Sequence, residues 1–541
     1  MRSAEAIRQA GQTVAWIRSH APEAAHLRID SREITPGDVF LALPGRRDDG
    51  RLHVTDAVAR GAAAIVIDRT GAQAPPCAAP MLQVERLAAQ LGDIGAAFYR
   101  DPTARLLMIG VTGTNGKTSC SHWIAQVLTA CGRNCAVIGT VGSGFTDALQ
   151  TDSALTTPDA IGLQRQARTL LDAGAQAVAM EVSSIGLDQG RADAVDFDLA
   201  LFTNLTRDHL DYHGSMAEYE RAKARLFDAP SLAYAVLNLD DAFGQRLAHR
   251  CRARHLRTTG YRVQASAPRA ADARLADAHG ANGEFADVDV ALAAQSVTLG
   301  ADDIRFDARW RPSGTAERTA SVRAPVIGRF NVSNVLGVLG IALAAGIDAQ
   351  DATRALERLR PPAGRLQRVD VGQGSAQGDD ALRDLPLVLV DYAHTPDAIE
   401  QALTALRPVA QARAGRLWIV FGAGGDRDPG KRPQMGAAAA RGADWVVVTS
   451  DNPRSEEPGT IIEQVIAGAI EAGARPGTNE DRARAITDAV LQADAADVVL
   501  IAGKGHEQYQ EIAGRRLPFS DVECARRALQ RRAGVAIGAA S

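Results

Sequence analysis

The stretch Leu-Leu-Met-Ile-Gly-Val-Thr-Gly-Thr-Asn-Gly-Lys-Thr-Ser, residues 106–119, decides the fold that we expect for this chain. It begins with a short apolar run, residues 106–111, which is typical of a buried parallel strand. After the stretch, apolar positions from Trp123 to Leu128 have helical spacing, and Gly132 closes the predicted helix. A strand therefore leads through a glycine-rich turn into a helix.

The turn between this strand and this helix has the residues of a phosphate-binding loop. Gly113 and Gly116 allow the backbone to approach an anion closely. Lys117 can reach terminal phosphates, and the hydroxyl of Thr118 can bind magnesium. The general pattern has glycine where this chain has Val111, so the match is close without being strict. We predict a nucleoside triphosphate site here, because a turn that only joins two elements does not need Gly-Lys-Thr at the start of its helix.

Length and charge limit the classes of protein to which this chain can belong. With about 100–200 residues in a typical domain, a chain of 541 residues is long enough for three or four domains. Its formal charge is −4, with basic and acidic residues interspersed, so it has no basic face for a nucleic acid. We therefore expect no nucleic acid partner.

The cysteines and the apolar runs indicate the compartment. Six cysteines are scattered without a Cys-x-x-Cys pair, which indicates neither a disulfide framework nor a structural zinc site. The N-terminal residues lack an apolar signal core, and the longest apolar run, 335–347, is too short and too interrupted by glycine to span a bilayer. We expect a soluble cytoplasmic protein without membrane insertion.

The pattern of predicted elements indicates an α/β protein of three domains. Residues 1–103 read as a small α/β domain, and residues 104–361 as a central domain built around the phosphate loop. Within the central domain, residues 262–325 have alternating, strand-like character and are expected to complete its sheet. Strands and helices alternate through residues 362–541, which predicts a doubly wound parallel sheet.

Polar residues of the central domain follow its predicted strands. Glu181 comes directly after a strand, where α/β sheets place ligands, and is a natural magnesium partner for Thr118. His209, flanked by Asp208 and Asp211, follows another strand; it is either a metal ligand or an ordinary histidine, and we favour the ligand. The central domain therefore has the residues for a magnesium and phosphate site.

Polar groups also gather at the strand ends of the third domain and in loops of the first. In the third domain they lie in 391–396, 424–432, 451–454 and 503–507, which predicts a binding site along one edge of the sheet. In the first domain, Ser31 and the arginines Arg46 and Arg47 could bind a diphosphate, although charged loops are more often only solvated.

Taken together, these motifs resemble the ATP-dependent Mur ligase family. The resemblance rests on Thr112–Thr118, Glu181–Ser184, Asp208–Asp211 and Asp391–Pro396 in this order, and it spans essentially the whole chain. The stretches of the third domain narrow it to the branch that adds meso-diaminopimelate to a UDP-N-acetylmuramoyl dipeptide. The resemblance implies an N-terminal uridine-nucleotide domain, a central P-loop ATPase-like domain and a C-terminal Rossmann-like domain that brings the amino acid.

The resemblance also implies which residues contact each substrate. It assigns to the UDP-muramoyl dipeptide the residues Ser31, Arg46, Arg47, Thr156, Thr157, Ser183, Gln189 and Arg191. It assigns to ATP the residues Gly113, Thr114, Asn115, Gly116, Lys117, Thr118, Ser119, Asn331, Arg365 and Asp391. It assigns to diaminopimelate the residues Arg427, Asp451, Asn452, Pro453, Arg454, Gly503 and Glu507.

Catalysis and metal binding are implied for a smaller set. Lys117, Glu181, His209 and Lys223 are the implied catalytic residues, and Thr118 joins the last three as magnesium ligands. Lys223 matches a lysine that the family carbamylates, which makes sense of a cation beside magnesium. The chain departs from the pattern at Ile185, where many relatives have histidine, so the role of that loop stays open.

The implied reaction is amide ligation through an acyl phosphate, with ATP and Mg²⁺ as cofactors and only small molecules as partners. We expect a monomer. The nearest alternatives are a family member that adds lysine at the same step, or a ligase of the folyl-polyglutamate type. A P-loop kinase or nucleotide-driven switch is the alternative from another class. A non-catalytic binding module is disfavoured, because every expected metal and phosphate group is present.

Overall fold

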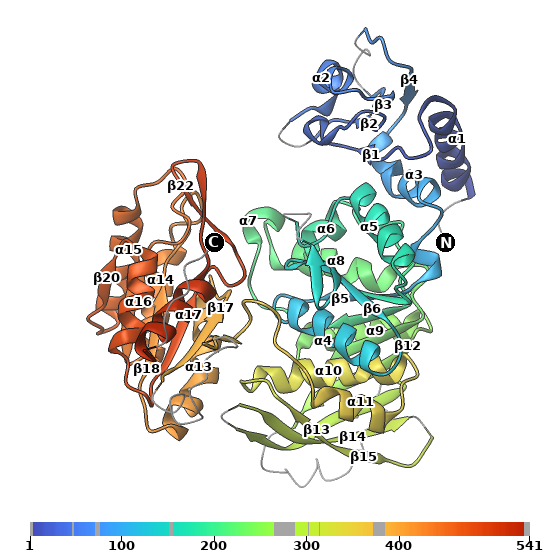
Figure 1. Ribbon diagram of the computed structural model, residues 1–541. Helices are drawn as coiled ribbons and strands as arrows, with labels where there is room; N and C mark the ends of the chain where they lie inside the picture. The colour runs from blue at the N-terminus through green and yellow to red at the C-terminus, as the bar shows by residue number, and fades with distance from the viewer. Residues whose placement is uncertain are drawn as a thin grey trace. The chain divides into compact units, whose positions relative to one another are not determined.

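The computed structural model describes residues 4–45, 48–70, 76–150, 155–264, 287–300, 302–312, 314–371 and 385–534 (Figure 1). The chain divides into two compact units. Unit 1 comprises Met1–Ala294, Ala308–Ala320 and Ser333–Leu356, and unit 2 comprises Gln295–Asp307, Ser321–Val332 and Glu357–Ser541. The α/β fold class is confirmed, because parallel strands alternate with helices in both units. The domain boundaries at residues 103 and 361 stay predictions.

The N-terminal part of unit 1 is a small parallel sheet in the order β1-β2-β3-β4, with helices packed on it. All four side chains of β2 are buried, as expected for a parallel strand that is covered on both faces. The strands are Leu27–Arg28 (β1), Val39–Ala42 (β2), Ala64–Asp68 (β3) and Met81–Val84 (β4), and the helices are Ala4–His20 (α1), Val54–Ala59 (α2) and Leu91–Phe98 (α3).

The large sheet of the chain has the strand order β15-β14-β13-β12-β11-β10-β5-β9-β6-β7-β8 within the described residues. Its strands from β13 to β6 are parallel where they pair, and the hairpins β6-β7-β8 are antiparallel. The middle strands are Leu107–Thr112 (β5), Cys135–Gly139 (β6), Ala177–Glu181 (β9), Leu199–Phe202 (β10), Tyr234–Asn238 (β11) and Arg257–Val263 (β12).

The strands at one edge of this sheet lie in the alternating part of the sequence. They are Val290–Leu299 (β13), Ile304–Pro312 (β14) and Arg318–Ala324 (β15), whereas Gly142–Phe145 (β7) and Ala148–Gln150 (β8) form the other edge. The expectation that the alternating region completes the central sheet is thus confirmed for its described residues, because β13 pairs with β12 over Val290–Ala294.

Helices of the central region cover this sheet. Its buried core contains residues of α5 and α9 such as Leu163 and Leu247, packed with strand residues such as Val178. Asp159 begins α5 by accepting bonds from the backbone N–H groups of Ile161 and Gly162. The helices are Lys117–Ala130 (α4), Ala160–Asp172 (α5), Ser184–Asp188 (α6), Leu210–His213 (α7), Met216–Ala224 (α8), Ala242–Ala253 (α9), Phe330–Ala344 (α10) and Ala349–Leu356 (α11).

The C-terminal sheet in unit 2 has the order β16-β17-β21-β18-β19-β20. It is parallel from β17 to β20, which confirms the doubly wound prediction, whereas β16 is antiparallel to β17. The strands are Gln367–Arg368 (β16), Leu387–Asp391 (β17), Leu417–Phe421 (β18), Trp445–Thr449 (β19), Gly477–Asn479 (β20) and Val498–Ala502 (β21).

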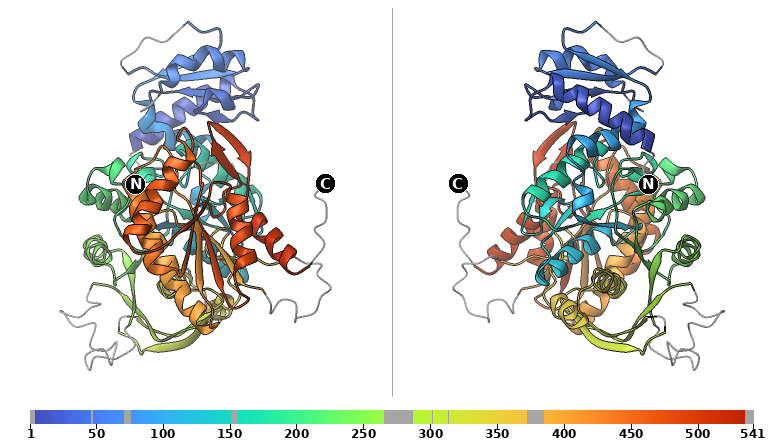
Figure 2. Two further views of the ribbon diagram at one scale, coloured as in Figure 1. Left: turned by 90° about the vertical axis from the view of Figure 1, so that its left-hand side faces the viewer. Right: turned by 90° about the vertical axis from the view of Figure 1, so that its right-hand side faces the viewer.

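Helices cover both faces of the C-terminal sheet (Figure 2), and a separate hydrophobic core buries each face. One core contains Leu403, Met435 and Val465, from Pro396–Ala412 (α13), Lys431–Gly442 (α14) and Pro458–Glu471 (α15). The other contains Ile486 and Leu529, from Arg482–Gln492 (α16) and Asp521–Arg532 (α17). Tyr509–Ile512 (β22) and Arg515–Pro518 (β23) pair as an antiparallel hairpin and form a separate two-stranded sheet. Among the described residues, no helix is both long and apolar enough to cross a membrane.

Candidate functional site

The glycine-rich turn between β5 and α4 requires its two glycines. Gly113 has φ +153, and a Cβ atom there would lie 1.9 Å from the Thr203 hydroxyl. Gly116 has φ +86, and a Cβ atom there would lie 2.6 Å from the amide oxygen of Asn334. Any side chain at either position would therefore displace the neighbouring residues, and the loop keeps its backbone open to an approaching anion.

Two residues that the sequence analysis did not select hold this loop in place. The Asn204 amide oxygen accepts a bond from the Asn115 N–H at 2.9 Å, and the Thr203 hydroxyl donates to the Asn115 carbonyl at 2.6 Å. Both residues directly follow β10, which pairs with β5. The rule that carboxyl ends of parallel strands share one edge could have indicated them.

Two lysine ammonium groups meet at one carbonyl of the loop. Lys117 donates to the Gly113 oxygen at 3.0 Å, and Lys223 donates to the same oxygen at 2.7 Å. Lys223 is only 1% exposed and also lies over the Tyr219 ring, 4.5 Å from its centre. Burial and, next, repulsion from Lys117 lower the pKa of Lys223 well below its ordinary value. The structure thus brings these two predicted catalytic residues together.

Thr118 and Glu181 form an oxygen pair beside the loop. The Thr118 hydroxyl donates to Glu181 Oε2 at 2.9 Å, and the backbone N–H of Thr140 donates to Glu181 Oε1 at 2.8 Å. A buried carboxylate beside a hydroxyl is a donor set that fits Mg²⁺, which usually takes one or two protein oxygens and fills its other positions with phosphate and water. No group of three or more His, Cys, Asp or Glu side chains within the described ranges could hold a metal on its own.

His209 lies on the side of the loop where Lys223 lies. It begins α7 with φ +52, its ring centre is 6.2 Å from that of Tyr219, and its Nε2 is 3.5 Å from Asp208. Burial lowers the pKa of His209, and the charges of Lys117 and Lys223 lower it further. The imidazole is therefore kept neutral, as a metal ligand requires, but its predicted role as a ligand stays a prediction.

Four of the residues predicted to bind the dipeptide form one hydrogen-bonded cluster. The Thr157 hydroxyl is 3.0 Å from the Ser183 hydroxyl, and Arg191 donates to the Thr157 carbonyl at 2.9 Å. Arg191 also donates to the Gln189 amide oxygen at 3.0 Å. The fifth residue, Thr156, accepts a bond from Thr140 at 3.0 Å, and Thr140 contacts Glu181. The cluster thus connects to the predicted magnesium pair through Thr140, and through the Thr157 hydroxyl, which donates to the Glu181 backbone carbonyl at 3.1 Å.

The predicted uridine residues are described only in part. Ser31 is buried and begins a short helical turn, Ser31–Glu33, just after β1. Arg46 and Arg47 lie outside the described residues.

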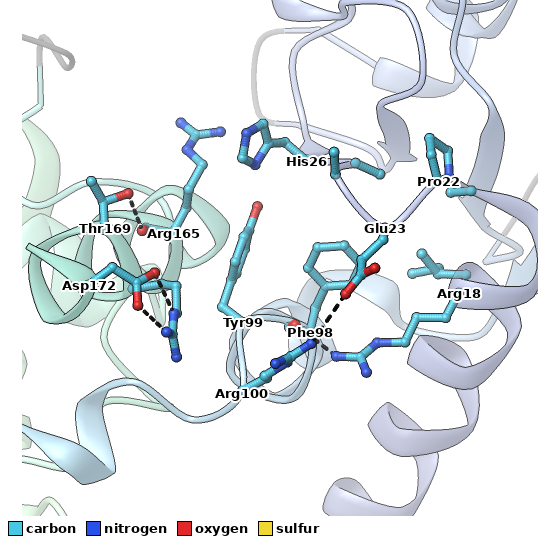
Figure 3. A pocket seen from close by; sticks show the side chains of 15 residues that line it. Arg18, Pro22, Glu23, His26, Phe98, Tyr99, Arg100, Arg165, Thr169 and Asp172 are labelled. Atoms are coloured by element: carbon cyan, nitrogen blue, oxygen red, sulfur yellow. Dashed lines mark hydrogen bonds and ion pairs between the residues drawn. The ribbon is translucent and has the colours of Figure 1, made fainter.

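A cavity of about 590 Å³ lies before the start of β1, at the other end of that strand from Ser31 (Figure 3). Residues near the end of α1, the end of α3 and one side of α5 line it. In the cavity wall Arg168 pairs with Asp172, and Arg18 donates to the Phe98 carbonyl at 3.1 Å. None of the predicted site residues lies among the residues that line it, so this cavity is separate from the predicted site.

Unit 2 contains the other predicted ATP residues. Asp391, at the end of β17, accepts bonds from the backbone N–H groups of Leu366 at 2.7 Å and Ala393 at 2.8 Å. Burial raises the pKa of Asp391, and the charge of Arg365 opposes that shift. Arg365 lies over the Tyr392 ring, 5.0 Å from its centre. Asn331 is buried and donates to the Ile327 carbonyl at 2.7 Å.

Residues that are predicted to bind the amino acid substrate follow β19 and β21, and they lie together. The Asn452 amide nitrogen donates to Glu507 Oε2 at 2.9 Å. Gly503 has φ +114, and a Cβ atom there would lie 2.5 Å from Asp451 Oδ2. The sequence rule that strand ends gather ligands therefore predicted a real cluster of side chains.

Arg454, one of the residues assigned to diaminopimelate, is held by backbone groups. Its guanidinium donates to the Gly425 carbonyl at 2.5 Å and lies 3.7 Å from Glu511 Oε2. Its own N–H donates to the Glu511 carbonyl at 3.0 Å, and its φ is +54. The side chain is 24% exposed, so part of it remains accessible. Arg427, from the neighbouring loop after β18, is exposed.

A buried ion pair, which the sequence analysis did not predict, is hydrogen-bonded to the backbone at the ends of β19 and β21. Arg482 and Asp521 are both 0% exposed and form two bonds of 2.7 Å. The same guanidinium donates to the carbonyls of Ser450 at 3.3 Å and Ala502 at 2.9 Å. These carbonyls precede Asp451 and Gly503, so Arg482 ties the two ligand-bearing segments to each other. Its partners come from remote parts of the sequence, which gave no local signal.

We predict that Gly503→Ala weakens amino acid binding, because its Cβ would collide with Asp451 in addition to straining the backbone. The matched control is Gly473→Ala, whose φ is +91 but whose Cβ would meet no atom within 4 Å. Positive φ alone costs about 1–2 kcal/mol, so both variants should unfold at a lower temperature. Only Gly503→Ala should raise KM for the amino acid. An equal change of KM in both variants would show that the collision with Asp451 is not the cause.

Comparison with known proteins places the whole chain in one group. Family descriptions match three successive parts: the Mur ligase family catalytic domain over residues 23–99, the Mur ligase middle domain over 111–342, and the Mur ligase glutamate ligase domain over 379–505. In chain order, the three matches fall on the N-terminal sheet, the large sheet and the C-terminal sheet described above.

Named relatives are similar over nearly their full lengths. A UDP-N-acetylmuramoyl-L-alanyl-D-glutamate–2,6-diaminopimelate ligase from Ralstonia nicotianae is 50% identical over 523 residues, which is 96% of this chain and 95% of the relative. An enzyme of the same name from Pseudomonas aeruginosa is 47% identical over 93% of this chain and 94% of its own.

Solved structures agree with this. A structure of an enzyme of that name is 34% identical with a TM-score of 0.58, and the match covers 94% of this chain and 95% of that chain. A MurF ligase from Thermotoga maritima in complex with ADP, 16% identical with a TM-score of 0.58 over 95% of this chain and 98% of its own, shares the fold.

Proposed function

Because the chain belongs to the Mur ligase family, we propose that it joins meso-diaminopimelate to UDP-N-acetylmuramoyl-L-alanyl-D-glutamate at the expense of ATP. The observation that carries this proposal is the phosphate loop on which Lys117 and Lys223 meet, beside the Thr118 and Glu181 oxygen pair. The amino acid is inferred from the names of the relatives that are 50% and 47% identical over nearly the whole chain.

The proposed reaction has two displacement steps. An oxygen of the D-glutamyl side-chain carboxylate attacks the γ-phosphorus of ATP, and the bond to the β,γ-bridging oxygen breaks, so that ADP leaves. An amine of diaminopimelate then attacks the acyl carbon, the C–O bond to phosphate breaks, and the nitrogen loses a proton. Catalysis of this kind depends mostly on positioning and on stabilising charge, so a nucleophilic side chain is unnecessary.

Lys117 stabilises the charge that develops on the transferring phosphoryl group. Its ammonium already lies at the loop, bonded to the Gly113 and Thr114 carbonyls at 3.0 and 2.8 Å. Thr157, Ser183 and Arg191 are linked to Glu181 through short hydrogen bonds, so they would orient the dipeptide next to the phosphate site. This arrangement explains why the acceptor carboxylate and ATP would meet at the end of β9.

Thr118 and Glu181 would hold Mg²⁺, with His209 and a modified Lys223 as further ligands. When bound, Mg²⁺ would neutralise phosphate charge. The protonated, ammonium form of Lys223 would repel the metal. Carbamylation removes this conflict: the neutral amine adds to the carbon of CO₂, an N–C bond forms, and one N–H proton leaves. Its burial against Tyr219, with its charge opposed by Lys117, favours the neutral amine that this step requires.

We predict that Arg454→Ala impairs ligation of diaminopimelate more than binding of ATP. Diaminopimelate differs from lysine by its distal carboxylate, which a guanidinium can hold with two parallel hydrogen bonds. Losing a charged hydrogen bond should lower kcat/KM for diaminopimelate by about tenfold or more, and the preference over lysine should narrow. Arg427 and Glu507 would contact the other end of either amino acid. The matched control is Arg475→Ala, because Arg475 is exposed and lies before β20.

Wild-type specificity constants for both amino acids in Arg454→Ala would show that this residue is not the selector. An equal loss in Arg475→Ala would point to a general effect of removing a positive charge from the unit. The comparison of the two amino acids also separates this proposal from the alternative that the enzyme adds lysine at the same step.

The direct test of the function is a ligation assay with purified protein, ATP and the UDP-linked dipeptide. We expect release of ADP that depends on both the dipeptide and diaminopimelate, with a product heavier by one diaminopimelate residue. Phosphate transfer to a hydroxyl would instead support a kinase, and nucleotide turnover without a joined product would support a switch. We also propose a monomer in the cytoplasm; the six free cysteines fit a reducing compartment, and sedimentation would test the monomer.

A further inference from the structure

Lys504 is a lysine that no solvent reaches. It follows β21, its side chain is 0% exposed, and a buried ammonium is unfavourable unless acceptors surround it. Three acceptors do so: Nζ is 2.9 Å from Asn452 Oδ1, 2.9 Å from Glu507 Oε2 and 3.9 Å from Asp451 Oδ1. All three partners belong to the set of residues proposed to bind the amino acid. The lysine is thus a buried residue that contacts three members of the proposed amino acid site.

The bonds of Lys504 fix which atoms its partners present. Asn452 Oδ1 accepts from Lys504 and from the Glu511 N–H at 2.9 Å, so the other end of the amide, Nδ2, points at Glu507. Both side-chain bonds to Glu507 fall on Oε2. No hydrogen bond reaches Oε1 from the described part of the chain, and this side chain is 20% exposed. One carboxylate oxygen is therefore anchored while the other is left to a ligand.

The charges around Glu507 keep it ionised. Burial raises its pKa, but the Lys504 ammonium, the bonds from Lys504 and Asn452, and the charge of His506 leave that pKa below its ordinary value. Asp451 Oδ1 lies 3.9 Å from the same ammonium, and burial raises the pKa of Asp451. Burial and, next, the charge of Glu507 raise the pKa of Tyr392. A carboxylate held ionised in a partly buried place is suited to an ammonium group of an incoming amino acid.

We propose that Lys504 is a positioning residue for the amino acid substrate, which orients Asn452 and Glu507 so that Oε1 of Glu507 receives a substrate ammonium group. Lys504 itself contacts no substrate, because it is fully buried. The inference deepens the proposed function and rests on it. It also gives a role to the buried lysine in the short segment between Gly503 and Glu507.

The test is Lys504→Met, which keeps the length of the side chain and removes the charge, assayed as the full chain with ATP, UDP-linked dipeptide and diaminopimelate. KM for diaminopimelate should rise about tenfold or more, as expected for the loss of charged hydrogen bonds, while KM for ATP and for the dipeptide keep wild-type values. The acid limb of kcat/KM for diaminopimelate should move to higher pH, because Glu507 without Lys504 takes up a proton more readily.

A double-mutant cycle with Glu507→Gln decides whether Lys504 acts through Glu507. If it does, the double variant should resemble Glu507→Gln alone, since the carboxylate to be oriented is already gone. Additive effects of the two changes on KM would overturn the proposal, as would a Lys504→Met enzyme with a wild-type KM and pH profile. A wild-type protein that ligates no diaminopimelate would instead overturn the proposed function.

A measurement on the unaltered protein covers the case in which Lys504→Met fails to fold, as judged by its thermal unfolding. The wild-type KM for diaminopimelate should stay constant as the pH falls to the ordinary pKa range of a glutamate, about 4.3, because Glu507 remains ionised there. Burial raises the pKa of the neighbouring Asp451, so the same profile should be recorded for Glu507→Gln. A rise of KM above that range in the folded wild-type protein that is absent from Glu507→Gln would contradict a carboxylate preset by Lys504.

Discussion

Lys117→Ala should lose ligation almost completely. The change removes an ammonium that lies at the phosphate loop, 2.8 Å from the Thr114 carbonyl, at the place where charge develops on the phosphoryl group. Removing one preorganised donor of this kind typically lowers kcat by about 10²–10³-fold. The loss of the full charge on Lys117 should reach at least that range. The measurement is steady-state release of ADP with saturating dipeptide and diaminopimelate.

A matched control separates this effect from a general loss of charge. Arg354→Ala removes an exposed cation from α11, which pairs with Asp351 one turn away and donates to the Gln350 carbonyl at 3.4 Å, and should leave turnover unchanged. Binding of the UDP-linked dipeptide to Lys117→Ala should also persist, because the Thr157 and Ser183 cluster does not depend on that lysine. Ligation by Lys117→Ala near the wild-type rate would remove the loop from the mechanism.

Lys223→Ala should be equally inactive, but chemically rescuable. If the working form of Lys223 is a carbamate, truncation removes a carboxylate-like ligand and leaves a buried space beside Tyr219 and Gly113. A short carboxylate such as acetate should enter that space and restore part of the activity in proportion to its concentration. Chloride at the same ionic strength should not. The rates should be measured at fixed Mg²⁺ concentration.

Two outcomes would contradict the carbamate. One is rescue by methylamine in place of acetate, which would identify the ammonium as the active form. The other is an intact mass without the added CO₂ in a wild-type sample that is active and metal-bound under the same conditions. Lys223→Ala with full activity would exclude any role for this residue.

Much of the fold follows from local patterns. Strand β19, Trp445–Thr449, is a run of mainly β-branched residues that ends just before the polar segment 451–454, so it is recognisable in the sequence. The phosphate loop was predicted because a glycine that must accept positive φ, such as Gly116, is recognisable in sequence. The hairpin of β22 and β23 was not predicted, since its strand β23 is entirely exposed and has no apolar alternation.

Residues of the candidate site could be predicted where they follow strands. The side chains that hold them in place could not be predicted, because their partners are distant in the sequence. Glu181, Asp391 and Asp451 all end or follow strands, so one topological rule indicates them. The Arg482 and Asp521 pair joins positions 39 residues apart inside unit 2, and nothing local distinguishes it from surface charge. The segment 503–507 was predicted to belong to a binding site, but nothing local indicates that Lys504 within it is fully buried. Only the folded chain shows which charges face inward.

The central claim is that the enzyme couples ATP to amide formation through an acyl phosphate. The most direct test uses UDP-N-acetylmuramoyl-L-alanyl-D-glutamate with both oxygens of the glutamyl side-chain carboxylate labelled with ¹⁸O. After ligation with diaminopimelate, the released inorganic phosphate should contain one ¹⁸O atom, and the new amide should retain the other. Unlabelled phosphate formed together with the ligated product would contradict the account, because the carboxylate would then never have been joined to phosphorus.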